Sequence, residues 1–102
     1  MVRTARIRHP QWSKGTIRAG LPTTVARAGT SSATWVRALC YQAGTLVFEQ
    51  FRQYDGSRTA TLTLGPTPSW SGGSATCRAE DGYWRRGSTW RVTGTSGFDV
   101  VG

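Results

Sequence analysis

Residues 33–54 read ATWVRALCYQAGTLVFEQFRQY and carry the clearest structural signal in the chain. Residues 33–42 and 45–54 are two runs rich in β-branched and aromatic side chains, a composition typical of strands. Ala43 and Gly44 between them fit a two-residue hairpin turn. We therefore predict an antiparallel hairpin with a defined register. The predicted pairs are Tyr41 with Leu46, Cys40 with Val47, Leu39 with Phe48, and Val36 with Phe51.

In this register both faces of the hairpin are apolar. The predicted first face carries Trp35, Leu39, Tyr41, Leu46 and Phe48, and the second carries Val36, Ala38, Cys40, Val47 and Phe51. Glu49 is the exception on the second face, and we expect it to pair with Arg37. A hairpin that is apolar on both faces belongs at the centre of a fold or beneath a partner.

The rest of the chain shows short strand patterns and no helical periodicity. Further strands are predicted over residues 16–19 or 23–28, 59–64, 74–80, 89–95 and 98–101. Turns are predicted at Asp55-Gly56, Asp81-Gly82 and Arg86-Gly87. The Pro- and Gly-rich residues 65–73 form a loop from which Trp70 is expected to reach the core. About seven short antiparallel strands predict one all-β sandwich domain over residues 16–102, preceded by a basic N-terminal arm over residues 1–15.

The two cysteines, Cys40 and Cys77, both fall on apolar strand faces. An even pair in a small β domain predicts one disulfide. The alternative is a pair of buried free thiols that pack as small hydrophobic side chains.

Residues 62–64 followed by residues 74–77 resemble the E strand, corner and F strand of immunoglobulin-like domains. The resemblance covers residues 33–80 and implies an immunoglobulin-like β-sandwich, with Cys40 as the first cysteine on a B-like strand and Phe51 as the core aromatic residue. Three features depart from the family pattern. The cysteine spacing is short, Ala75 stands where a tyrosine corner would place Tyr, and the tight turn at 43–44 keeps two strands in one sheet.

Residues 40–48 together with residues 70–77 are similar to small immunoglobulin-like proteins of high-GC bacteria and their phages. Domains of that kind typically decorate capsids or tails. The resemblance therefore implies a virion context and capsid or tail subunits as partners, and it implies no chemistry.

The charge balance is strongly basic, at +8, and all but one of the 13 cationic side chains are arginines. Such a charge favours anionic partners, or else it keeps the protein soluble. No apolar run is long enough for a membrane helix, so no membrane span is expected. The N-terminus has basic residues without an apolar run behind them and does not resemble a signal peptide; either the protein is not exported by that route or a signal was removed.

Catalysis has little support. The lone histidine, His9, lies in the arm before a proline, and a catalytic histidine must be held rigidly against a nucleophile. Glu80 and Asp81 are adjacent and would point to opposite faces of a strand, and Asp55 and Asp81 precede glycines as turn residues do. The cysteine and histidine spacing fits no zinc site. We therefore expect no enzymatic activity, no metal, no cofactor and no small-molecule substrate.

Two groups of residues are candidates for binding. The first interleaves aromatic rings with cations, a combination that can stack on sugars or bases and hold anions. It consists of Tyr83, Trp84, Arg85, Arg86, Trp90 and Arg91. The alternative is that Trp84 and Trp90 pack in the core while the arginines line the solvent face. The second group lies in the arm and consists of Arg3, Arg6, Arg8, Trp12 and Lys14.

These observations lead to three hypotheses. The first is a non-enzymatic virion accessory protein that decorates a capsid or associates with a tail. The second is a secreted, extracellular module that binds carbohydrate, another anionic surface or a cell surface, supported by the five tryptophans and the predicted disulfide. The third is a basic nucleic-acid-binding protein.

Overall fold

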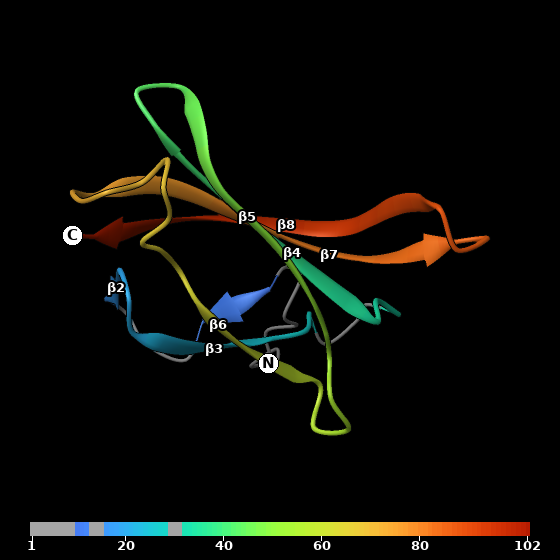
Figure 1. Ribbon diagram of the computed structural model, residues 1–102. Coiled ribbons are helices and arrows are strands. Elements are labelled where there is room, and N and C mark those ends of the chain that lie inside the picture. The colour runs from blue at the N-terminus through green and yellow to red at the C-terminus, as the bar shows by residue number, and fades with distance from the viewer. Residues whose placement is uncertain (1–9, 13–15, 29–31) are drawn as a thin grey trace, which may run out of the picture.

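The computed structural model describes residues 10–12, 16–28 and 32–102, and within these ranges it is all-β (Figure 1). Eight strands are present in the described residues. They are β1 (Gln11–Trp12), β2 (Ile17–Arg18), β3 (Pro22–Ala26), β4 (Trp35–Gln42), β5 (Thr45–Gln53), β6 (Thr59–Thr63), β7 (Ala75–Arg85) and β8 (Thr89–Val101). No helix in these ranges is long and apolar enough to cross a membrane.

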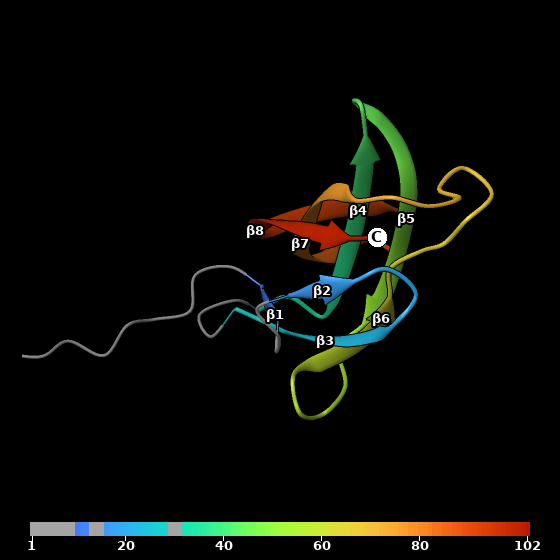
Figure 2. The same cartoon turned by 90° about the vertical axis from the view of Figure 1, so that its left-hand side faces the viewer.

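The strands form two sheets that lie against each other, as expected for a β-sandwich (Figure 2). The small sheet has the order β1-β3-β6 and the large sheet has the order β2-β8-β7-β4-β5. All neighbours are antiparallel except β2 and β8, which run parallel. The sequence-based expectation of an all-β fold is confirmed.

The core lies between the two sheets and is built from alternating positions along each strand. Val25 and Leu62 come from the small sheet, and Val36 and Val100 come from the large sheet. Trp70, only 1% exposed, reaches this core from the loop after β6, as predicted. Its ring lies edge-on to Phe48, with ring centroids 6.3 Å apart.

The β4–β5 turn is the predicted two-residue turn. Ala43 and Gly44 both have positive φ values, 50° and 80°, which is the geometry of a type I′ hairpin turn. Tyr41 pairs with Leu46 as predicted, but a bulge at Val47 then shifts the register by one residue. The Val47 carbonyl accepts a 2.7 Å hydrogen bond from the Thr67 hydroxyl, which places the loop over residues 65–73 against this part of β5.

The bulge corrects the predicted pairs beyond Tyr41. The observed pairs are Cys40 with Phe48, Leu39 with Glu49, and Val36 with Arg52. Because a one-residue shift exchanges the two faces of a strand, Phe48 turns toward the core and Phe51 turns away from it. The expectation that Phe51 is the core aromatic residue is therefore wrong.

Two further boundaries differ from the prediction. Asp81 and Gly82 form no turn but lie inside β7, at a bulge in its pairing with β8. Residues 89–95 and 98–101 belong to one continuous strand, β8, rather than two. The long β7–β8 hairpin needs no break at these positions because the bulge lets the strands bend while they stay paired.

Cys40 and Cys77 form the predicted disulfide, which excludes the free-thiol alternative. The two residues are direct cross-strand partners on β4 and β7, and both are buried. The bond therefore joins neighbouring strands of the large sheet. A first cysteine on a B-like strand would have connected the two sheets, and this bond does not.

Candidate functional site

The side of the large sheet that faces away from the small sheet is called the outer face below. Three aromatic rings from three strands meet there: Phe51 on β5, Trp84 on β7 and Trp90 on β8. Their centroids lie 5.0 Å apart for Phe51 and Trp84, 5.1 Å for Phe51 and Trp90, and 5.2 Å for Trp84 and Trp90. All three side chains are half-buried, so this aromatic cluster is still accessible to a partner.

A glycine makes room for the cluster. A Cβ atom at Gly82 would lie 2.6 Å from Cζ2 of Trp90 and 2.3 Å from the carbonyl oxygen of Arg91. Only glycine allows the indole ring of Trp90 to lie directly on the backbone of β7 at this position.

A chain of charged side chains crosses the outer face beside the aromatic cluster. Arg37 on β4 forms ion pairs with Glu49 on β5 and with Glu80 on β7, at 3.4 Å for the second. Glu80 also accepts a hydrogen bond from Trp90 Nε1 at 3.1 Å and forms an ion pair with Arg78 at 3.3 Å. The expected pairing of Glu49 with Arg37 is confirmed. Two arginines and two glutamates thus neutralise one another at the centre of this face.

The Arg37 guanidinium also lies 5.4 Å from the ring centroid of Phe51, within range of a cation–π contact. Burial by itself lowers the pKa of Arg37, but the hydrogen bond and charge of Glu49, together with Glu80, raise it above its ordinary value. Arg37 therefore stays charged and fixes the position of the Phe51 ring.

Exposed apolar side chains extend the outer face. Leu46 is 43% exposed and Val92 is 47% exposed. The strand pairing places Leu46 beside Tyr41, and Val92 beside Gly82 on the same face as Trp84 and Trp90. Val92 therefore extends the aromatic cluster, while Leu46 lies near the β4–β5 turn and is separated from the cluster by the Leu39–Glu49 pair.

The end of the β7–β8 hairpin differs in character. Beyond the Trp35–Gly82 pair β7 has no further pairing with β4, and its only strand partner among the described residues is β8. Residues 83–91 therefore form a two-stranded ribbon, which projects from the sheet in Figure 1. Arg86 and Gly87, with φ values of 54° and 76°, close it with the predicted turn.

The six predicted binding residues all lie in this ribbon, but on two different faces. Trp84 and Trp90 pair across the strands and point to the outer face. Tyr83, Arg85 and Arg91 alternate with them and point to the opposite face, while Arg86 stands in the turn. The alternative in which Trp84 and Trp90 pack in the core is wrong, because both rings lie half-buried on the outer face and not in the core between the sheets. Ligand binding by these two rings stays a prediction.

Of the predicted arm residues, the structure places Trp12. It lies in β1 beside β3, and its ring is 4.5 Å from that of Phe98. Arg3, Arg6, Arg8 and Lys14 lie outside the described residues, as does His9.

Sequence reasoning missed the roles of three residues. Phe51 was assigned to the core, and Glu80 was considered only as half of a carboxylate pair. Asp81 was predicted as a turn residue, yet it is fully buried. Its carboxylate accepts hydrogen bonds from the Tyr54 hydroxyl and from the Ala28 backbone N–H, the latter at 2.8 Å. This network joins β7 to the segments that follow β3 and β5. No sequence signal distinguishes Asp81 from an ordinary Asp-Gly turn.

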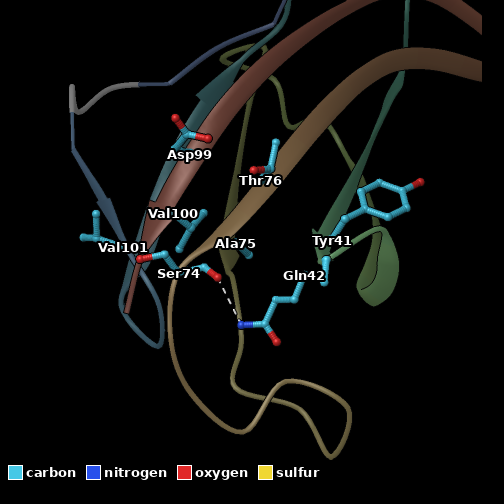
Figure 3. Close-up of a pocket in the computed structure, with 9 residues that line it drawn as sticks. Tyr41, Gln42, Ser74, Ala75, Thr76, Asp99, Val100 and Val101 are labelled. Atoms are coloured by element: carbon cyan, nitrogen blue, oxygen red, sulfur yellow. Dashed lines mark hydrogen bonds between the residues drawn. The ribbon is translucent and has the colours of Figure 1, made fainter.

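An open hollow lies at the opposite end of the large sheet, where β4, β7 and β8 approach the turn of the β4–β5 hairpin (Figure 3). Asp99 supplies the carboxylate among its described lining residues. The Gln42 side chain donates to the carbonyl oxygens of Gly72 and Ser74 at 2.9 and 3.0 Å, so it closes one wall of the hollow.

Comparison with protein-family models, curated proteins and solved structures yields no match to this chain.

Proposed function

We propose that this chain is an immunoglobulin-like, non-enzymatic binding module that docks onto the subunits of a virion through the outer face of its large sheet. The aromatic cluster of Phe51, Trp84 and Trp90 on that face carries the proposal. Large aromatic side chains and arginines dominate the binding energy of protein interfaces, and here they are held half-exposed by a rigid sheet.

The strand order supports the immunoglobulin-like part of the proposal. The order β8-β7-β4-β5 corresponds to strands G, F, C and C′ of a variable-type domain, and β3 pairs with β6 as strand B pairs with strand E. The intra-sheet disulfide is a departure from the family, since its cysteines lie on the equivalents of C and F.

The charge distribution supports a protein partner for the outer face. Although the chain carries +8, the two arginines and two glutamates at the centre of this face are paired with one another. Aromatic residues and arginine are enriched in protein–protein contacts, and the charges beside the aromatic cluster are already paired within the chain. The resemblance of residues 40–48 and 70–77 to phage-associated immunoglobulin-like proteins supports capsid or tail subunits as that partner.

The test is co-sedimentation of the protein with virions from its source, in a regular stoichiometry. Val92→Asp places a charge at the edge of the aromatic cluster, on a side chain that is 47% exposed and outside the core. We expect this variant to bind at least tenfold more weakly, because a carboxylate would be buried without a partner. Leu21→Asp is the matched control, since Leu21 is 53% exposed and lies between β2 and β3.

Two results would overturn this proposal. The first is wild-type protein that stays in the supernatant with every particle preparation. The second is an equal effect of Val92→Asp and Leu21→Asp, which would show that the outer face is not the contact surface.

The disulfide favours a second candidate, a secreted module that binds carbohydrate, because disulfides persist in oxidising compartments. Titration with glycans while tryptophan fluorescence is recorded tests it. A response that Trp84→Ala and Trp90→Ala abolish would favour carbohydrate binding over the virion contact.

A further inference from the structure

The projecting ribbon over residues 83–91 is a second surface, distinct from the outer face. Three arginines lie on it, and all of them are exposed: Arg85, Arg86 and Arg91. None of the three forms an ion pair with any part of the chain that the structure describes. Residues 82–98 contain no acidic residue, so their charge is not neutralised locally.

The acidic residues of the chain are engaged or distant. Glu49 and Glu80 pair with arginines of the outer face, and Asp81 is buried beside Tyr54. Asp55 accepts hydrogen bonds from backbone N–H groups of its own turn, and Asp99 lies opposite Thr76 in the strand register, near the other end of β8. The ribbon is therefore a cationic projection whose counter-charge must come from a partner or from solvent ions.

Strand pairing sets the arrangement of the three guanidinium groups. Arg85 faces Thr89 and Arg91 faces Tyr83, so the two arginines are diagonal neighbours on one face of the ribbon. Diagonal neighbours of this kind lie about 7–8 Å apart. Arg86 adds a third cation at the turn, and the Tyr83 side chain, 38% exposed, supplies a hydroxyl on the same face as Arg85 and Arg91.

We propose that this ribbon binds the phosphate backbone of duplex DNA. A two-stranded ribbon is narrow enough to enter the major groove, which is ~12 Å wide. A duplex carries one negative charge per ~1.7 Å of its axis, so each of three closely spaced arginines can meet a phosphate. Guanidinium groups bind phosphates through two parallel hydrogen bonds, and tyrosine hydroxyl groups are also frequent phosphate donors.

The ribbon is less suited to an acidic polysaccharide. Sugar rings bind by stacking on flat, open aromatic side chains, but the two tryptophans of the ribbon face away from its arginines. Their rings pack on each other and on Phe51. The same packing joins the middle of the ribbon to Phe51 on β5, and the turn with its arginines lies beyond this contact.

This inference does not depend on the proposed function, because it uses the face of the ribbon opposite the aromatic cluster. The experiment measures binding of the full chain to a 20-base-pair duplex of arbitrary sequence by fluorescence anisotropy over a range of salt concentrations. Each phosphate contact contributes about −0.9 to the slope of log K against log salt. The variant with Arg85, Arg86 and Arg91 all changed to Gln is expected to reduce the magnitude of the slope by about 2.7.

The matched control changes Arg18, Arg52 and Arg58 to Gln, which removes the same charge from exposed arginines outside the ribbon. We expect this control to leave the slope within about 0.5 of the wild-type value. The three single ribbon variants guard against misfolding of the triple variant, and each should reduce the slope by about 0.9. Circular dichroism and thermal melting verify that every variant is folded.

Several results would overturn the proposal: no binding to the duplex at low salt, no change in slope for the ribbon variants, or equal changes in the ribbon variant and its control. Binding to dextran sulfate or polygalacturonate that is tighter than binding to the duplex at the same salt concentration would also overturn it, and would assign the ribbon to an acidic polysaccharide. None of these outcomes bears on the Val92→Asp test of the outer face.

Discussion

The buried contact between Tyr54 and Asp81 offers a direct test of what holds the two sheets and their connections together. Tyr54→Phe removes one hydroxyl group and keeps the ring, so it leaves the packing of the core unchanged. The Tyr54 side chain is 9% exposed and Asp81 is fully buried, so water cannot replace the lost donor without cost. The Ala28 backbone N–H still reaches the other carboxylate oxygen.

A hydrogen bond to a charged group contributes about 1.5–3 kcal/mol to the free energy of unfolding. With about 2 kcal/mol lost, the Tm of a domain of this size falls by roughly 8–16 °C. Urea and thermal unfolding at pH 7 measure both quantities, and the urea m-value should not change, because the fold is the same. Tyr83→Phe is the matched control, since Tyr83 is 38% exposed; it should change stability by less than about 0.5 kcal/mol.

The pH dependence gives an independent measurement. Burial first, and then the hydrogen bond and charge of Asp81, raise the pKa of Tyr54 well above its ordinary value. A folded-state pKa above the unfolded value means that this contribution to stability is complete below about pH 10 and is lost as the pH rises further. The wild-type protein should therefore lose stability above pH 10 more steeply than Tyr54→Phe. If Tyr54→Phe were as stable as Tyr83→Phe at pH 7, the role given to this contact would be refuted.

Three further predictions concern other contacts. Changing both Cys40 and Cys77 to Ala should lower the unfolding free energy by about 4 kcal/mol, from the entropy of the loop that the disulfide closes, and urea unfolding with and without reductant measures the same term. Gly82→Ala should lower the unfolding free energy by about 1–3 kcal/mol and alter tryptophan fluorescence, because the new Cβ would lie 2.3 Å from a backbone oxygen of β8. Gly56→Ala is the control and should have little effect on either quantity, because the space around Gly56 is open. Backbone hydrogen bonds from residue 59 first and then residue 57 lower the pKa of Asp55, so its contribution to stability is present above about pH 4 and is lost as the pH falls further. Asp55→Asn should therefore make the free energy of unfolding fall less steeply below pH 4. An unchanged dependence of stability on pH in this range would contradict this role.

Much of the fold was predictable because short-range chemistry sets it. Alternating apolar residues, Gly-containing turns and the absence of helical periodicity predicted an all-β chain. The Ala43–Gly44 turn and the burial of Trp70 in the core were predicted correctly, because each has a local cause. The first is a turn geometry that favours glycine, and the second is a large apolar ring in a loop otherwise unable to bury it.

The candidate site was only partly predictable. The sequence brought Trp84, Trp90 and three arginines into one segment, but it could not show that the rings and the cations face opposite sides. It also assigned Phe51 to the core. The reason is the bulge at Val47, which is held by the Thr67 hydroxyl, a residue distant in the sequence. One inserted residue exchanges the faces of everything beyond it, and nothing within β5 itself signals the insertion.

The sequence by itself determined the all-β class, the single cysteine pair, the hairpin turns at residues 43–44 and 86–87 and the basic character of the chain, because composition and neighbouring residues set each of these. The tertiary structure decided which strands became neighbours, and therefore that the disulfide lies within one sheet and that Asp81 is a buried acceptor for Tyr54. It also separated a neutral aromatic face from a cationic ribbon. These outcomes depend on pairings between residues far apart in the chain, whose free energies come from packing and from burial of polar groups that no local pattern records.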